Sequence, residues 1–152
     1  MIVKAISLYE PWATAIRLGL KQYETRSWPT SYRGPLLICG AKRWSTAQRD
    51  FLLRRDVQAA LGGALVIPGY GPQRMLLGKA ACLVDLVSCR QITRQAWPTR
   101  PEALFGDWTP GRYAWQCANV RPIEPFPVTG RQGLFEVEIP DDLLRNAHEI
   151  NP

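Results

Sequence analysis

Glycine and proline residues divide this chain into short apolar segments, and this division constrains the fold more than any other feature. The chain holds 12 glycines and 13 prolines among 152 residues. Between them lie two apolar runs, residues 34–41 (GPLLICGA) and 78–89 (GKAACLVDLVSC), which are typical of buried strands. Residues 2–8, 111–120 and 134–139 also have strand-like patterns. This spacing predicts about five to seven strands in a small, mixed or antiparallel β-barrel with helices at its side.

Two helices are expected beside the barrel. Pro11 suits a first helical turn, where its missing N–H has no partner to lose, and Gly19 suits the left-handed position that ends a helix. Ser45 and Gln48 have capping-box spacing, which predicts the start of the second helix. Asp56 can cap a fresh turn, so the second helix is either continuous or divided there.

The chain length fits one α+β domain over residues 1–152, and its 46% of hydrophobic residues are enough for a core. Residues 62–77 (GGALVIPGYGPQRMLL) predict a loop or hairpin tip, which we expect to be the most mobile segment. Residues 140–150 predict one terminal helical turn capped by an aspartate. No linker or second domain is expected.

Several locations and site classes are disfavoured. No apolar run approaches the roughly 18 residues that span a bilayer. The first residues (MIVKAISLYEPW) contain a lysine and lack a small-residue cleavage site, so they predict a strand and not a signal peptide. We therefore expect a soluble cytoplasmic protein without membrane contact.

The cysteines and the histidine argue against metal and disulfide sites. No two cysteines have C-x-x-C spacing, and we expect buried free thiols at Cys39, Cys82, Cys89 and Cys117. The single histidine, His148, lies near the C-terminus, so a catalytic triad or a histidine metal centre would have to rest on it. No phosphate-loop motif occurs. The sequence thus predicts neither a metal nor a cofactor.

The net charge favours an anionic partner. It is +6, with a pI of about 9.5, and 15 of the 19 basic residues are arginine. Arginine binds phosphate with two N–H groups and stacks on flat rings. Six tryptophans and five tyrosines accompany these cations. The combination suits RNA, another nucleic acid or a nucleotide, although a basic protein with aromatic residues in its core has the same composition.

Residues 19–26 (GLKQYETR) have the dense pattern G-x-K-x-x-E-x-R and run from the helix end into a predicted short strand over residues 21–28. Lys21 is either a catalytic base or nucleophile, a clamp for phosphate, or a solvated lysine. Glu24 and Arg26 are either a surface ion pair or site residues. In a site, Glu24 would transfer protons or read a base edge, and Arg26 would orient Glu24 or hold a phosphate. On a strand Lys21 would face away from both, unless a turn lies before Tyr23.

Asp85 interrupts the apolar strand ACLVDLVSC, where a buried carboxylate without a partner costs several kcal/mol, on the order of 2–7. We expect Lys21 or Arg26 as its partner, unless it marks a bulge at a strand end. Aromatic residues that suit stacking on a base, or else core packing, are Tyr9, Trp12, Trp28, Tyr113 and Trp115.

Four segments together resemble the ASCH domain family, named for activating signal cointegrator-1 homology. They are ISLYEPWATAIRLGLKQYETRSW, YRGPLLICGAK, GKAACLVDLV and YAWQCANVRPIEPFPVTGRQGLFEVE. The resemblance covers most of residues 3–139, is weak over about 45–77, and includes the family signature G-x-K-x-x-E-x-R. It implies a PUA-like β-barrel with flanking helices, and an enlarged insertion at about 45–77.

The resemblance also implies a cleft that holds Lys21, Glu24 and Arg26 and opens to nucleic acid or a modified nucleoside. An acidic residue near Asp85 is common in the family. Some members resemble RNA-binding or DNA-binding modules, and others are hydrolases, including ribonucleases and amidohydrolases of N4-acetylcytidine. In the amidohydrolases a threonine stands three residues after the lysine, where this chain has Glu24, with Thr25 next and on the opposite strand face.

Three hypotheses follow. The leading one is binding of RNA or a modified nucleotide in this cleft, with Arg33 and Lys42 extending its positive rim. The second is a metal-independent hydrolase in which Lys21 activates water, Glu24 or Asp85 relays protons and Arg26 steadies the oxyanion. The third is a protein-interaction module with a basic surface.

Overall fold

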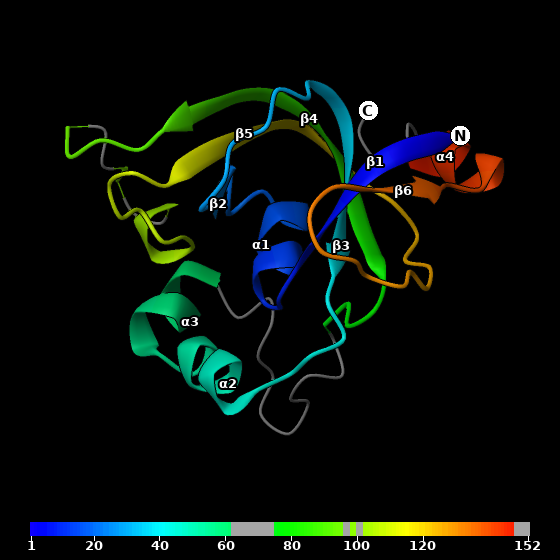
Figure 1. The fold of residues 1–152 in the computed structure, drawn as a ribbon. Helices are drawn as coiled ribbons and strands as arrows, with labels where there is room; N and C mark the ends of the chain where they lie inside the picture. The colour runs from blue at the N-terminus through cyan, green and yellow to red at the C-terminus, as the bar shows by residue number, and fades with distance from the viewer. Residues whose placement is uncertain (62–74, 96–97, 100–101, 148–152) are drawn as a thin grey trace.

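A single six-stranded sheet forms the centre of the molecule, with the strand order β2-β5-β4-β3-β1-β6 (Figure 1). The computed structural model describes residues 1–61, 75–95, 98–99 and 102–147. The strands are β1 (Ile2–Leu8), β2 (Tyr23–Arg26), β3 (Gly34–Gly40), β4 (Ala80–Gln91), β5 (Tyr113–Pro122) and β6 (Phe135–Glu138). Each segment that the sequence predicts as a strand therefore forms one.

The sheet is mixed and open. β1 and β3 are parallel, and every other neighbouring pair is antiparallel. The α+β class with a mixed sheet and flanking helices is confirmed. β2 and β6 are the two edges, and among the described residues no pairing joins them, so the sheet does not close into the predicted barrel. Both edge strands are only four residues long, which leaves few backbone groups for a closing ladder.

Helix α1 (Trp12–Arg17) lies in the concave side of the curved sheet (Figure 1). Ala13 and Ile16 are fully buried and pack in one cluster with apolar side chains of β1, β3, β4 and β5. The helix ends as predicted: Gly19 has a φ of +77°, and the N–H of Leu20 donates to a carbonyl of the last turn. The chain therefore turns sharply just before β2.

The second predicted helix is divided in two. α2 (Thr46–Leu52) begins with the predicted capping box of Ser45 and Gln48, and α3 (Arg55–Leu61) has Asp56 in its first turn. Leu52, Val57 and Leu61 of these helices are buried with Phe105, which fixes the pair beside the sheet. They form the described part of the segment expected as an insertion.

Two short elements complete the described fold. A 3-10 turn, Glu102–Leu104, precedes β5, and α4 (Asp141–Ala147) follows β6, where the sequence predicts only one turn. No helix within the described ranges is long and apolar enough to cross a membrane. Most of the loop predicted over 62–77, and also His148, lie outside the described residues.

Candidate nucleic-acid cleft

The amino group of Lys21 is enclosed by three oxygen atoms at the turn before β2. Its side chain has an exposed fraction of 0%. Nζ donates to the carbonyl oxygens of Tyr23 at 2.5 Å and Phe105 at 2.6 Å, and lies 3.7 Å from Oε1 of Glu24. An ammonium group has three donors, and each of them has an oxygen nearby. Lys21 is therefore held inside the molecule and is absent from the surface of the cleft described below.

Glu24 and Arg26 project from β2 beside this ammonium group. Glu24 accepts the N–H of Thr25 at 2.9 Å, and its second carboxylate oxygen lies 3.4 Å from Nη2 of Arg26. The same Nη2 donates to the carbonyl of Ser7 at 2.9 Å. The Nε atom of Arg26 is shielded from solvent and has no hydrogen-bond partner among the described residues. The turn therefore brings Lys21 and Glu24 together, as the sequence analysis allowed.

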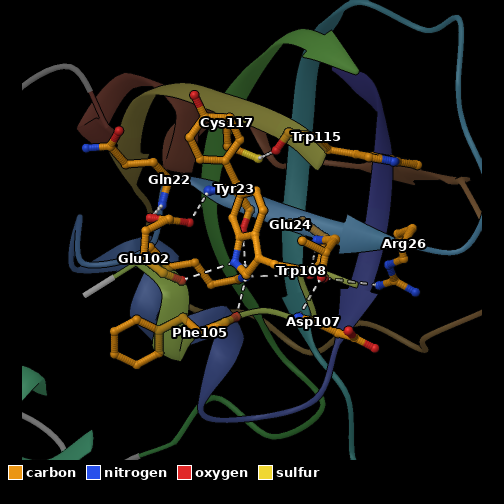
Figure 2. A network of polar contacts seen from close by, with 12 residues as sticks. Gln22, Tyr23, Glu24, Arg26, Glu102, Phe105, Asp107, Trp108, Trp115 and Cys117 are labelled. Carbon is orange, nitrogen blue, oxygen red and sulfur yellow. Dashed lines mark hydrogen bonds and ion pairs between the residues drawn. The ribbon is translucent and has the colours of Figure 1, made fainter. Parts of the chain in front are cut away.

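A segment about 80 residues away in the sequence fastens this turn (Figure 2). The carboxylate of Glu102 accepts the N–H groups of Gln22 and Tyr23, both at 2.8 Å. Phe105 supplies the carbonyl that Lys21 binds, and the indole of Trp108 packs edge-on against Tyr23 with ring centroids 5.6 Å apart. Residues 102–108 therefore fix the backbone from which Glu24 and Arg26 project.

A cleft of about 1240 Å³ opens beside β2. It is lined by Glu24, Thr25 and Arg26, by α1 and α2, and by the loops around residues 41–43, 103–107 and 129–133. The described lining contains the two carboxylates Glu24 and Asp107, and six cations: Arg26, Lys42, Arg43, Arg54, Arg112 and Arg131. Six positive against two negative side chains give this surface a charge of +4, which favours an anionic ligand.

Three of these cations have no carboxylate partner among the described residues. Arg26 pairs with Glu24, and Arg112 pairs with Asp107 at 3.5 Å. Arg54 pairs with Asp56, which lies outside the lining. Within the described part of the chain, no ion pair involves Lys42, Arg43 or Arg131. These three side chains keep their full positive charge available to a ligand.

Aromatic rings line the same cleft. They are Tyr9, Trp12, Trp28, Phe51 and Phe105. Tyr9 is 49% exposed, whereas Trp28 packs edge-on against Trp115 with centroids 4.8 Å apart. Trp115 is fully buried and belongs to the core. Of the aromatic residues expected at a site, Tyr9, Trp12 and Trp28 therefore reach the cleft and Trp115 does not.

The structure sorts the remaining expected residues. Lys42 lines the cleft, whereas Arg33 donates to the carbonyls of Thr30 and Tyr32 and lies outside the lining. Tyr113 is paired with Arg26 in the β2–β5 ladder and packs against the main core cluster. Arg33 and Tyr113 therefore lie outside the described cleft surface.

Thr25 directly follows Glu24 within β2, where successive side chains point to opposite faces of the strand, as the sequence analysis expects. Its hydroxyl oxygen accepts the N–H of Asp107 at 3.0 Å, and it lines the cleft. Gly106 lies against the side chain of Thr25 and lines the cleft together with Asp107. Glu24 and Thr25, although neighbours on the strand, therefore both line the cleft.

Asp85 has a different partner from the one expected. Arg121 binds both of its carboxylate oxygens, at 2.9 and 3.2 Å, and Asn119 donates to it at 2.9 Å. The expectation that Lys21 or Arg26 pairs with Asp85 is wrong, because Arg121 pairs with Leu83 in the β4–β5 ladder, two residues from Asp85 along β4. A register shift lies between Leu83 and Asp85, so Asp85 does mark an irregularity, although within the strand and not at its end. Hydrogen bonds from Arg121 and Asn119 lower the pKa of Asp85. Asp85 is absent from the cleft lining.

A fully buried carboxylate, Glu10, was missed by the sequence analysis. It accepts the N–H of Thr14 at 2.8 Å, the hydroxyl of Thr14, and the N–H of Leu76 at 2.9 Å. Its own carbonyl accepts the side-chain amide of Gln48 at 2.9 Å. Glu10 thus joins α1, α2 and the chain that enters β4. Its position just before Pro11 could have indicated this role, because the helix dipole stabilises a carboxylate at a helix start.

The cysteines have no disulfides. Cys39, Cys82 and Cys117 are buried and Cys89 is half-buried, as free thiols. Burial raises the pKa of Cys39 to about 12, so this thiol stays protonated at neutral pH. Among the described residues, no three histidine, cysteine, aspartate or glutamate side chains come together as metal ligands.

Comparison with known proteins identifies the family. The ASCH domain model matches residues 6–127. Activating signal cointegrator 1 from Homo sapiens is 26% identical over 134 residues, and the Mus musculus protein is 25% identical over the same length. These alignments cover 88% of this chain but only 22% of those proteins. A crystal structure of ASCH from Zymomonas mobilis has the same fold, with a TM-score of 0.54 at 14% identity, covering 97% of this chain and 94% of that one. The chain belongs to the ASCH domain family.

Proposed function

We propose that this chain binds RNA, or a modified nucleotide of the same chemistry, in the cleft beside β2. The observation that carries the proposal is the pairing of cations with aromatic rings. Lys42, Arg43 and Arg131 have no ion pair among the described residues. They border a cleft whose aromatic lining includes the exposed Tyr9 and the half-buried Trp12, Trp28 and Phe51. Cations neutralise phosphates and rings stack on bases, so this combination suits nucleic acid better than an acidic peptide.

Arg26 supports the proposal from inside the cleft. Its Nε is shielded from solvent, so a ligand would meet the part of the side chain that is exposed, which is 25%. Glu24, Ser7 and the enclosed Lys21 hold the guanidinium group in place, so Arg26 acts as the anchor and Lys21 acts as a positioning residue that does not touch the ligand.

The test is the salt dependence of binding to a fluorescein-labelled single-stranded RNA, measured by fluorescence anisotropy. Each neutralised phosphate contributes a slope of about −0.7 in log K against log salt for single strands, so three free cations predict a slope of roughly −2. Lys42→Ala and Arg131→Ala should each lower the steepness by about 0.7. Arg33→Ala is the matched control, because it removes the same charge outside the cleft and should leave the slope unchanged.

Two results would overturn the proposal. One is an absence of measurable binding at low salt, which would favour a protein-interaction module instead. The other is an equal effect of Arg33→Ala and Lys42→Ala, because equal effects would mean that RNA responds to the overall charge and not to the cleft.

A hydrolase acting on the same ligands is the second candidate, and the position of Thr25 favours it. Thr25, Glu24 and Arg26 all line the cleft, so residues that carry a hydroxyl, a carboxylate and a guanidinium group are neighbours at one site. Incubation with N4-acetylcytidine and with short RNA, followed by chromatography, tests this candidate. Turnover that is lost in Glu24→Gln and Thr25→Val supports it, and an unchanged substrate over a day rejects it.

A further inference from the structure

One wall of the cleft carries a stack of flat groups that the binding of a single nucleotide at Arg26 leaves unused. Trp12 of α1 and Phe51 of α2 lie nearly parallel, with ring centroids 4.9 Å apart and an interplanar angle of 28°. Arg54 lies over the ring of Phe51, with Cζ 5.8 Å from its centroid. All three residues line the cleft. We call them the α2 stack.

The guanidinium group of Arg54 is held in a fixed plane although it is half exposed. It sits at the break between α2 and α3, where Asp56 accepts its Nε at 3.1 Å and its Nη2 at 2.6 Å. The side chain is 53% exposed, and Nη1 donates no hydrogen bond to any described residue. A guanidinium group with two anchored nitrogens and an aromatic ring on one side has little rotational freedom left to lose when a flat ligand stacks on it.

We propose that the α2 stack binds the base of a second nucleotide, so that the ligand is a single strand of two or more nucleotides and not a free nucleoside. This inference rests on the proposed function. Bases stack on aromatic rings and on arginine planes without sequence preference. Ligand pockets for small molecules usually have volumes of about 300–1,000 Å³, and this cleft of about 1240 Å³ is larger. The free cations Lys42 and Arg43 lie in the same lining and would neutralise the phosphate that joins the two nucleotides.

The test compares mono-, di- and trinucleotides with a trinucleotide that has one abasic position, by isothermal titration calorimetry on the full chain. An abasic nucleotide keeps the phosphate and removes only the base. The wild type should gain about 5- to 150-fold in affinity on lengthening, and the correctly placed abasic position should remove this gain. The variant Arg54→Lys keeps the charge but has no flat group, so it should lose the gain with length and keep the salt slope.

Arg55→Lys is the matched control, since it makes the same change one residue away and outside the cleft lining. If Arg54→Lys retains the full gain with length, or if no abasic position affects the affinity, the α2 stack is not a base subsite, while the proposed function stands. If the wild type binds none of the oligonucleotides, both proposals fail together. The subsite is supported if the gain with length is lost in Arg54→Lys and retained in Arg55→Lys, and if the abasic position no longer changes the trinucleotide affinity of Arg54→Lys.

Discussion

Replacing Lys21 by methionine tests whether its buried ammonium group holds the cleft together. Methionine has a similar length, so the substitution removes the charge and donors with little change in packing. It leaves the carbonyls of Tyr23 and Phe105 without this donor, and it leaves Glu24 without one of its two cations.

The cost follows from these contacts. Breaking a buried ion pair by removing one partner costs about 3–5 kcal/mol. Glu24 keeps Arg26 at 3.4 Å and the N–H of Thr25, and its side chain is 11% exposed, so we expect the lower end, about 3 kcal/mol. For a chain of this size that loss lowers Tm by about 6–12 °C.

Urea unfolding followed by tryptophan fluorescence measures the change in free energy of unfolding. Lys4→Met is the matched control, because Lys4 pairs with Glu136 at the surface and its loss should cost at most about 1 kcal/mol. The double variant Lys21→Met/Glu24→Gln should recover part of the loss, because no uncompensated carboxylate remains. A cost for Lys21→Met no larger than that of Lys4→Met would refute the structural role assigned to this ammonium group.

Three further outcomes are expected. Hydrogen bonds, first from Arg121, lower the pKa of Asp85 below its ordinary value of 3.8. The ionised carboxylate therefore stabilises the fold above that ordinary value, and the stabilisation is lost as the pH falls through the lowered pKa. In urea titrations, the stability difference between wild type and Asp85→Asn should shrink below about pH 4. The half-buried Cys89 should react with a thiol reagent in the folded protein at pH 8, whereas Cys39, whose pKa burial raises to about 12, should react only on unfolding, as mass spectrometry would report. Glu102→Gln should weaken the two hydrogen bonds to the turn before β2 and lower the free energy of unfolding by about 1–3 kcal/mol. It should also lower RNA affinity, and an unchanged affinity would mean that this turn does not contribute to RNA binding in the cleft.

Local features of the fold were predictable because each depends on a few neighbouring residues. The capping box at Ser45, the left-handed Gly19 and the break before Asp56 each follow from side-chain chemistry within one helical turn. The strands followed from apolar runs between glycines and prolines. Such signals place elements along the chain, but they carry little information on how an open sheet differs from a closed one.

Contacts that depend on register or on distant segments were not predictable. Asp85 meets Arg121 because of the register in which β4 pairs with β5, and the residue pattern does not fix that register, although the lone carboxylate did indicate an irregularity in the strand. The carboxylate of Glu102 meets the turn before β2 only after the chain has folded. The motif therefore indicated that Lys21, Glu24 and Arg26 belong together, whereas the enclosure of Lys21 depended on a carbonyl 84 residues away.

The contacts of Glu10 have a consequence for how the chain tolerates changes in length. Gln48 in α2 and the backbone of Leu76 both bind this one residue, so the intervening chain leaves and returns to a single fixed point. When the ends of a loop are already joined, doubling its length costs only about 0.6 kcal/mol of closure entropy. Changes in the length of the chain between α3 and Met75 should therefore cost little closure entropy and leave the contacts of Glu10 with α1, α2 and Leu76 in place.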